Sequence, residues 1–453
     1  MALERFSFIG MSQAELALLE ADVKKRLEKL PSDTDKATVK VKVFQVVHEI
    51  LREMGALARI DATEEQQIAE AIHNDIFSVG ELSAYLDDPT ITDILVNNYK
   101  TVFIVREDGS KMQIPVEFDS PQELKATINR FLTDIGGGKE LSPTRPMVTG
   151  RMEHKGRIYR VHAVSDPVSF GGVSMAIRKF RDTAFSPEQL IQQRSWTPEL
   201  AVFYEYMTKR RCNHLVAGGT GSGKTSLLNT LIHYYVPKNL RIITIETEVE
   251  LWIDPEAHPD VCRWEAQDPN FEQQGAIEQG VLLKNALRFA PNIILLGEAR
   301  GADIIDVLNS MSTGHPGSMT TLHCDSIEGL IPRIVFMTKS DRSDISEDSI
   351  RLLVGSTLDF VSFIKRYEPE VDDVDPEHGH HLIDSVWEVF YYPQNQAYIK
   401  TQEAAFVYED SVAFVPIFKR HPQTQNLDCV GRISPKRIEE KFQGVDPLQG
   451  GAG

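Results

Sequence analysis

Eight residues in the middle of the chain have the types and spacing of a phosphate-binding loop. The run GGTGSGKT, residues 218–225, matches G-x-x-x-x-G-K-[ST] in full. Glycines let backbone N–H groups close around phosphates, and a following helix adds the positive potential of its N-terminus. We expect Lys224 to reach the β- and γ-phosphates of ATP and the Thr225 hydroxyl to bind Mg²⁺. The predicted nucleotide-binding residues are Gly218, Gly219, Thr220, Gly221, Ser222, Gly223, Lys224, Thr225 and Ser226.

A strand and a helix flank this loop, which is the context that makes the pattern specific. Residues 215–217 are apolar and SLLNTLIHYY from residue 226 has helical spacing, so a glycine-rich turn without a ligand is disfavoured. The stretch 213–365 alternates strand and helix patterns, which predicts a parallel α/β sheet. Before it, Ser-Pro-Glu from residue 186 and Thr-Pro-Glu from residue 197 predict two helix starts.

Acids and a histidine follow three further strand patterns in the same stretch. They are Glu246, Glu248 and Glu250 in RIITIETEVEL (241–251), Glu298 in NIILLGEARG (292–301) and His323 in GSMTTLHCDS (317–326). Ligands of an open α/β sheet bind at the carboxyl ends of the strands. We therefore expect all three segments to converge on the bound nucleotide.

The order of these four segments resembles the type II/type IV secretion ATPase family. Members have a phosphate loop, an acidic box, a Walker B strand ending in Gly-Glu, and a histidine box. Upstream, residues 82–109 are similar to the amino-terminal domain of the family, and residues 150–164 and 171–180 to its basic strands. The resemblance covers about residues 40–440 and is closest to the Flp/Tad pilus subgroup.

The resemblance implies a role for each matching residue. Glu250 matches the catalytic glutamate that polarises the attacking water, and Glu298 matches the Walker B glutamate near Mg²⁺. His323 matches the histidine that senses the γ-phosphate. Three residues match the amino-terminal arginines, whose guanidinium groups neutralise transition-state charge as arginine fingers do: Arg151, Arg160 and Arg178.

One residue departs from the family pattern. The acidic box usually begins with Glu-Asp, whereas here Thr247 follows Glu246. A second carboxylate is therefore missing at this place. Because Glu250 is intact, we still expect hydrolysis, at a reduced rate.

The resemblance also implies the fold class and its division into domains. We expect an α/β protein in which a RecA-like P-loop ATPase domain follows an α+β (PAS-like) domain and a helical segment. The expected parts are a helical segment at 1–78, the α+β domain at 79–182, a linker with a lead-in helix at 183–212, and the ATPase domain with a C-terminal extension at 213–453.

In function, the resemblance implies a Mg²⁺-dependent ATPase that acts as a motor in a hexameric ring. The ring would drive export of pilin or another substrate and pass its movement to an inner-membrane platform protein. Such a protein is cytoplasmic and associates peripherally with the cytoplasmic face of the inner membrane.

Composition sets limits on partners and location. The formal net charge of −18 argues against direct stable binding of nucleic acid, which favours a basic surface. No apolar run approaches the roughly 18 residues of a membrane-spanning helix, and the first ten residues lack the apolar core of a secretory signal.

Four scattered cysteines without a CxxC pair favour reduced thiols. DPEHGHH (375–381) lacks zinc-site spacing and predicts a hydrated loop.

Two alternatives from other classes stay open. One is a nucleic-acid motor or the ATPase of a conjugative DNA-transfer system, which DNA-stimulated hydrolysis would favour. The other is an assembly scaffold that nucleotide locks without hydrolysis, an idea that Thr247 supports. The sequence does not distinguish pilin, secreted protein or DNA as the transported substrate.

Overall fold

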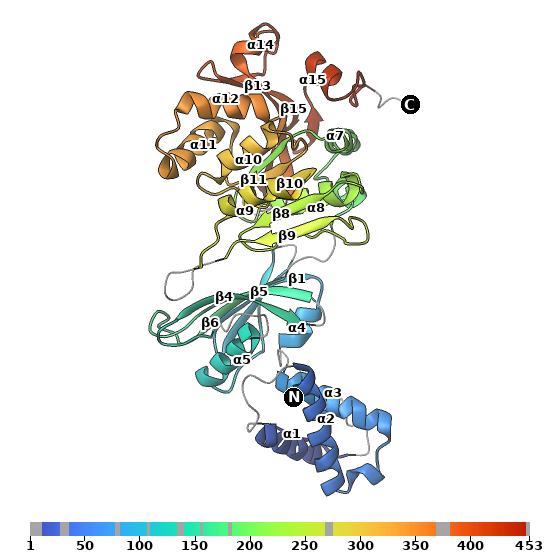
Figure 1. The fold of residues 1–453 in the computed structure, drawn as a ribbon. Coiled ribbons are helices and arrows are strands. Elements are labelled where there is room, and N and C mark those ends of the chain that lie inside the picture. Colours follow the sequence, from blue (N-terminus) through green and yellow to red (C-terminus); the bar gives the residue numbers. More distant parts are fainter. Residues whose placement is uncertain are drawn as a thin grey trace. The chain divides into compact units, whose positions relative to one another are not determined.

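The chain is described from a computed structural model. It contains two compact units, Met1–Phe180 and Arg181–Gly453, which are taken in turn below (Figure 1). Within the described part of the chain, no helix combines the length and apolar content needed to cross a bilayer. The histidine loop of DPEHGHH lies outside that part, apart from His381. The described residues are 11–27, 36–77, 82–106, 109–133, 140–154, 157–179, 184–267, 275–367 and 381–449.

The first unit begins with helices that pack through one apolar stripe each. Leu16, Leu19 and Val23 of the first helix and Val47 of the second belong to one buried cluster, which Ile68 of the third helix completes. The i, i+3, i+7 spacing of these two leucines and one valine puts their side chains on one face of the first helix. The elements are α1 (Gln13–Leu27), α2 (Lys36–Glu53), η2 (Ala56–Ala58) and α3 (Ala62–Phe77).

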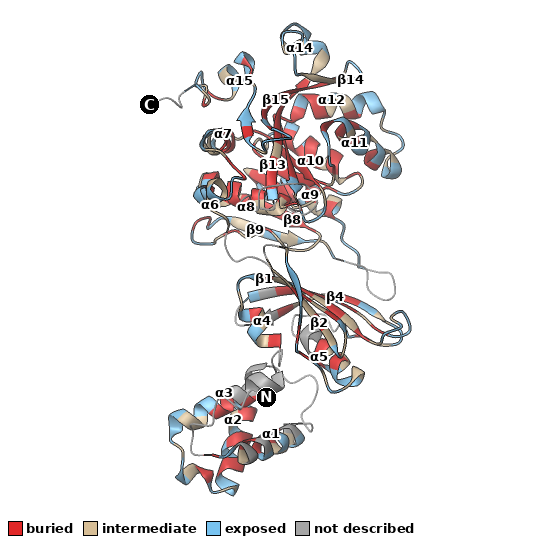
Figure 2. Cartoon of the chain, turned by 180° about the vertical axis from the view of Figure 1, so that it is seen from behind, coloured by how far each residue is buried: buried red, intermediate tan, exposed pale blue. Residues whose placement is uncertain are grey.

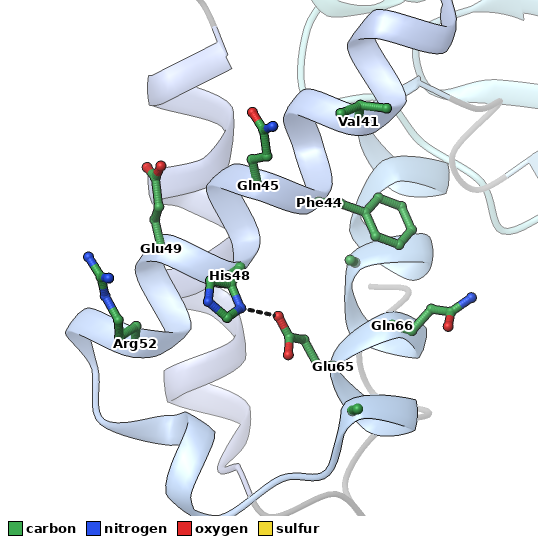
Figure 3. Close-up of a pocket in the computed structure, with 10 residues that line it drawn as sticks. Val41, Phe44, Gln45, His48, Glu49, Arg52, Glu65 and Gln66 are labelled. Carbon is green, nitrogen blue, oxygen red and sulfur yellow. Dashed lines mark hydrogen bonds and ion pairs between the residues drawn. The ribbon is translucent and has the colours of Figure 1, made fainter.

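A groove of about 770 Å³ lies between α2 and α3 (Figure 3). Val41, Phe44 and Ala69 contribute to its apolar lining. His48 Nδ1 lies 2.6 Å from Glu65 Oε1, so one polar contact joins the two helices across the groove. The part of the surface that the groove exposes is thus mixed, with an apolar floor and polar rims.

The first unit also contains a six-stranded antiparallel sheet in the order β3-β2-β1-β6-β5-β4. Its strands alternate buried and less buried residues, as a sheet covered on one face requires. Together with two helices the sheet forms the expected α+β arrangement. The elements are α4 (Ser83–Asp87), β1 (Ile91–Asn98), β2 (Thr101–Arg106), β3 (Lys111–Ile114), α5 (Pro121–Thr133), β4 (Met147–His154), β5 (Arg157–Val164) and β6 (Ser174–Lys179).

A ten-stranded mixed sheet organises the second unit. Six strands run parallel in the order β12-β7-β11-β10-β8-β9, which places the phosphate-loop strand β7 between β11 and β12. This is the expected RecA-like P-loop fold. The parallel strands are β7 (His214–Gly218), β8 (Ile242–Glu246), β9 (Val261–Glu265), β10 (Ile293–Leu296), β11 (Met319–Leu322) and β12 (Phe360–Arg366).

The sheet continues beyond β12 through antiparallel strands that the sequence patterns only partly indicated. The run SVWEVFYY (385–392) has a strand pattern and lies in β13 up to Tyr391, whereas β9 and the strands that follow β13 were not predicted. The additional strands are β13 (His381–Tyr391), β14 (Phe406–Tyr408), β15 (Val412–Arg420) and β16 (Leu427–Cys429).

Helices cover both faces of this sheet, so its central strands are buried throughout (Figure 2). One apolar cluster joins the sheet to α7 (Pro198–Lys209) and α8 (Lys224–Tyr235). Another joins the opposite face to four further helices. Burial on two faces explains why these strands are short continuous apolar runs. The helices of the opposite face are α9 (Gln279–Ala286), α10 (Asp303–Ser312), α11 (Ile327–Asp341) and α12 (Glu347–Thr357).

Side-chain caps begin the two helices predicted from the Ser/Thr-Pro-Glu sequences. Ser186 Oγ accepts the Gln189 N–H at the start of α6 (Pro187–Gln192), and Thr197 Oγ1 accepts the Leu200 N–H at the start of α7, both at 3.2 Å. Each cap satisfies one of the free N–H groups of a first helical turn. Both predicted helix starts are therefore confirmed.

A buried ionic cluster attaches the last helix to the base of the sheet. Glu388 of β13 accepts hydrogen bonds from Ser434 N–H and Oγ, at 2.9 and 2.7 Å, and from Arg437 Nε at 3.2 Å. Arg437, in α15 (Pro435–Glu440), also pairs with Asp359, whose other oxygen accepts the Asn213 N–H directly before β7. One guanidinium group therefore compensates two buried carboxylates.

Replacing Arg437 by Met should destabilise the second unit by about 3–5 kcal/mol, because Glu388 would stay buried without its cation and Asp359 would keep only Lys441, 3.5 Å away. Urea unfolding followed by circular dichroism measures this loss. The neighbouring exposed residue supplies a control, and Lys436→Met should change the free energy of unfolding by less than about 0.5 kcal/mol. Equal stability of the two variants would contradict the assignment.

Candidate nucleotide site

The phosphate loop requires glycine at several positions for steric reasons. Strand β7 ends at Gly218, which is in register with Ile364 of β12, and a Cβ on Gly218 would overlap the Ile364 carbonyl oxygen. Gly221 and Gly223 have φ of 67° and 100°, in the left-handed region that disfavours other residues. The loop therefore keeps a tight curve against β12 and leads directly into α8, whose first turn contains Thr225 and Ser226.

Two side chains of the loop fit a phosphate group. Lys224 Nζ donates to the carbonyl oxygens of Gly218 and Gly219, at 3.0 and 2.7 Å, and burial lowers its pKa. Ser222 is buried, and its Oγ has no hydrogen-bond partner among the described residues. The ammonium group is thus already held at the loop and can exchange carbonyl oxygens for phosphate oxygens.

The acidic segment lies against the start of α8. Thr225 Oγ1 donates to Glu250 Oε2 at 3.3 Å, and Asn229 Oδ1 accepts the Trp252 N–H at 3.0 Å. These two contacts attach Glu250 and Trp252 to α8, the helix that follows the phosphate loop. The predicted catalytic carboxylate is therefore beside the predicted magnesium-binding hydroxyl.

A chain of polar contacts joins the phosphate loop to the Walker B segment. His323 Nδ1 lies 3.2 Å from Lys224 Nζ, and His323 Nε2 lies 3.2 Å from Glu298 Oε1. Because an ammonium group only donates, Nδ1 accepts the hydrogen bond from Lys224, and Nε2 faces Glu298 at ion-pair distance. Glu298 also pairs with Arg300 at 3.1 Å.

The two residues expected near Mg²⁺ contact different partners. Thr225 contacts Glu250, while Glu298 contacts His323 and Arg300. That Thr225 and Glu298 share a metal ion stays a prediction. Arg333 lines a pocket of about 180 Å³ beside Glu298.

The three predicted arginines lie in the other unit and form a row across its sheet. Arg151 of β4 is in register with Arg160 of β5, which is in register with Arg178 of β6. Residues directly opposite on neighbouring strands share one face of a sheet. Arg178 Nε also lies 2.8 Å from Asp93 Oδ1, the residue opposite it on β1. The sheet thus concentrates three guanidinium groups on one face.

Glu246 is buried at the end of β8, where the strand expected over 241–251 stops. Its Oε1 accepts the N–H groups of Glu250 and Leu251, at 2.9 and 2.8 Å, and these bonds turn the chain away from the sheet. Burial raises the pKa of this carboxyl to about 7. Sequence patterns did not separate Glu246 from Glu248 and Glu250, because alternation alone does not show which acid is enclosed.

The stability contributed at Glu246 should depend on pH. Its carboxyl has a raised pKa of about 7 in the folded state, so the folded protein keeps a proton that the unfolded chain has lost above its usual pKa of 4.5. Stability is therefore lost as pH rises from 4.5 to 7, by about 3 kcal/mol in total. Glu246→Gln, which cannot ionise, should gain stability over the wild type between pH 5 and pH 8.

Urea unfolding of both proteins at the two pH values measures this gain. The exposed Glu256→Gln should show no such difference. A stability difference for Glu246→Gln that does not change with pH would show that Glu246 titrates normally.

Known proteins share sequence similarity with this chain over the region that contains the site. Residues 78–361 match the family described as type II/IV secretion system protein. The type IV secretion system protein VirB11 of Brucella suis is 30% identical over 312 residues, which cover 63% of this chain and 84% of that protein. A putative conjugal transfer protein of Mycobacterium tuberculosis is 28% identical over 259 residues, 56% of this chain and 71% of that protein.

Among solved structures, the Brucella suis VirB11 ATPase in complex with sulphate is 26% identical, covers 71% of this chain and 95% of its own, and has a TM-score of 0.36. The pilus retraction motor PilT with bound ADP is 20% identical. The match covers 63% of this chain and 77% of the PilT chain, with a TM-score of 0.47. Since the family match spans most of the chain, this protein belongs to the type II/IV secretion system protein family.

Proposed function

We propose that this chain is an ATP-hydrolysing motor subunit of a bacterial secretion or pilus-assembly machine. One observation carries the proposal: at one edge of the parallel sheet, His323 lies 3.2 Å from both Lys224 and Glu298, and Thr225, the residue after Lys224, contacts Glu250 at 3.3 Å. A phosphate loop alone would also fit a kinase or a GTPase. The acid and histidine segments, in the order found in the secretion family, favour a motor.

In the proposed reaction, the phosphate loop holds the β- and γ-phosphates while Lys224 exchanges its two carbonyl partners for phosphate oxygens. Glu250 accepts a hydrogen bond from a water molecule in place of the Thr225 hydroxyl and orients it. The water oxygen bonds to the γ-phosphorus as the bond to the β–γ bridging oxygen breaks, which releases ADP and phosphate. Mg²⁺ bound with ATP would neutralise phosphate charge, and Thr225 and Glu298 are the side chains proposed to hold it or its waters.

His323 is proposed to report whether a γ-phosphate is present. Its Nδ1 accepts from Lys224, so the contact is available only while that ammonium group faces the histidine. When Lys224 turns to phosphate, His323 loses this contact while its Nε2 still faces Glu298, 3.2 Å away. Nucleotide occupancy would thus reach the Walker B segment through one side chain.

The assembly and the domain limits are part of the same proposal. We infer a hexameric ring whose movement passes to an inner-membrane platform protein, with the chain at the cytoplasmic face of that membrane. The four parts at 1–78, 79–182, 183–212 and 213–453 remain our proposed boundaries. Within the family, the Flp/Tad pilus subgroup is the proposed placement.

A second candidate is the ATPase of a conjugative DNA-transfer system. It is favoured by one observation, the similarity to a mycobacterial protein named as a putative conjugal transfer protein. Such an ATPase need not touch DNA, so the net charge of −18 does not count against it. Hydrolysis stimulated by DNA would favour this candidate.

ATP hydrolysis measured across protein concentration tests the motor directly. We expect the rate to rise more than linearly with concentration, as a site completed by assembly requires, and to depend on added Mg²⁺. Glu298→Gln should lower the rate at least about 100-fold while ATP binding is retained, because one preorganised charged group near the phosphates is removed. The exposed Glu256→Gln serves as the matched control and should keep full activity.

The scaffold alternative makes the opposite prediction. It requires ATP binding with no turnover at any concentration and function that survives Glu298→Gln. Both results together would contradict the motor function and support a scaffold that nucleotide locks without hydrolysis.

The arginine row gives a separate prediction for catalysis. Arg160→Ala should reduce turnover at least about 10-fold with little change in ATP affinity, because the proposed guanidinium group acts on transition-state charge. Arg157 lies on the same strand three residues earlier, so it faces the other side of the sheet, and Arg157→Ala should keep activity. Equal losses in both variants would show a structural effect, and no loss in either would exclude Arg160 from the reaction.

A further inference from the structure

Glu246 fixes the backbone that carries the predicted catalytic carboxylate. Its side chain is only 2% exposed, and a single oxygen, Oε1, accepts the N–H groups of Glu250 and Leu251 at 2.9 and 2.8 Å. The segment between β8 and these residues has no regular secondary structure of its own. The Glu250 backbone is therefore held by side chains rather than by strand or helix hydrogen bonds, and Glu246 supplies the bond to the Glu250 N–H itself.

Gly297, directly after the neighbouring strand β10, leaves space for the Glu246 side chain. Strands β8 and β10 pair in parallel, and the Gly297 N–H donates to the Ile245 carbonyl at 2.9 Å directly after β10. A Cβ on Gly297 would lie 2.9 Å from Glu246 Cγ. The glycine before Glu298 thus lets the Glu246 side chain lie between the acidic segment and the Walker B segment.

Gln279, the first residue of α9, joins the same two segments from another side. It is buried, and we assign its amide orientation from its neighbours: with the oxygen toward Thr247, both amide atoms find partners, and the oxygen accepts the Thr247 N–H at 3.1 Å. The amide nitrogen then donates to the Glu298 carbonyl and to Asp303 Oδ2, both at 3.3 Å. One amide group therefore spans the segment that carries Glu250 and the segment that carries Glu298.

We propose that Glu246 and Gln279 form a buried brace that positions the carboxylates of Glu250 and Glu298 for hydrolysis. They are positioning residues, since their hydrogen bonds go to the backbone of the two segments. The inference rests on the proposed ATPase function. A preorganised site avoids reorganisation during the reaction, and a displacement of about 1 Å in such a site costs about 100-fold in rate. The brace therefore acts on turnover rather than on nucleotide affinity, which the phosphate loop supplies.

Three substitutions and one control test the brace at pH 8. Glu246→Leu and Gln279→Leu remove the hydrogen-bonding groups at similar size, whereas Glu246→Gln keeps an acceptor oxygen. Thr244→Val is the matched control, because Thr244 is a buried residue of β8 whose Oγ1 has no partner among the described residues. We expect the leucine variants to lower kcat about 10- to 100-fold with KM for ATP within about threefold. Glu246→Gln should keep at least about half of wild-type kcat, and Thr244→Val all of it.

Hydrogen exchange of the same proteins gives a readout that does not need activity. The amides of Glu250 and Leu251 should exchange faster in Glu246→Leu than in the wild type or in Thr244→Val. Should Glu246→Leu fail to fold, Gln279→Leu tests the brace from its other end, with exchange followed at the Thr247 amide.

The failure of the brace and the failure of the proposed function are distinguishable. Wild-type kcat in both leucine variants, or unchanged amide exchange, would overturn the brace while leaving the ATPase intact. Equal losses of kcat in the leucine variants and in Glu246→Gln would also overturn it, since the acceptor oxygen would then not matter. A wild-type protein without turnover would overturn the function, and exchange would still decide whether the brace exists.

Discussion

The parallel pairing around β7 is the constraint on which the nucleotide site depends. Ala217 is in register with Leu322 of β11, and Gly218 with Ile364 of β12, so the ends of these strands are aligned. Strands β8 and β10 extend the same ladder. Because parallel strands bring their carboxyl ends to one edge, the phosphate loop, the acidic segment, the Walker B segment and the histidine segment all emerge there. No side chain on Gly218 would be compatible with this spacing.

Electrostatic compensation within the site follows from that alignment. Lys224 is partly buried, which disfavours its charged form, yet carboxylates of Glu250, Glu298 and Asp325 near it favour the charge. His323 connects this ammonium group to Glu298 without adding a charge of its own in the neutral tautomer. The Gly218 and Gly219 carbonyl oxygens hold the lysine at the loop, where a bound phosphate group would replace them.

The two units concentrate charge of opposite kinds for different reasons. Acids gather at the strand ends of the second unit, and the sheet of the first unit aligns Arg151, Arg160 and Arg178 in one row. Like charges directly opposite on neighbouring strands are unfavourable, and Asp93 offsets part of this cost. Such a row of arginines in a chain of net charge −18 is a local feature that total composition cannot reveal.

The sequence by itself determined the phosphate loop, its strand and helix, the capped starts of α6 and α7, and the acids and histidine at strand ends. These features are local, since each depends on residue types within a few positions. Only the tertiary structure decided that Glu246 is enclosed, that Gln279 lies between two site segments, and that Arg437 compensates two carboxylates. It also decided the positions of β9 and the strands after β13. Such contacts join residues far apart in the chain, and no short-range pattern specifies which distant groups will meet or be removed from water.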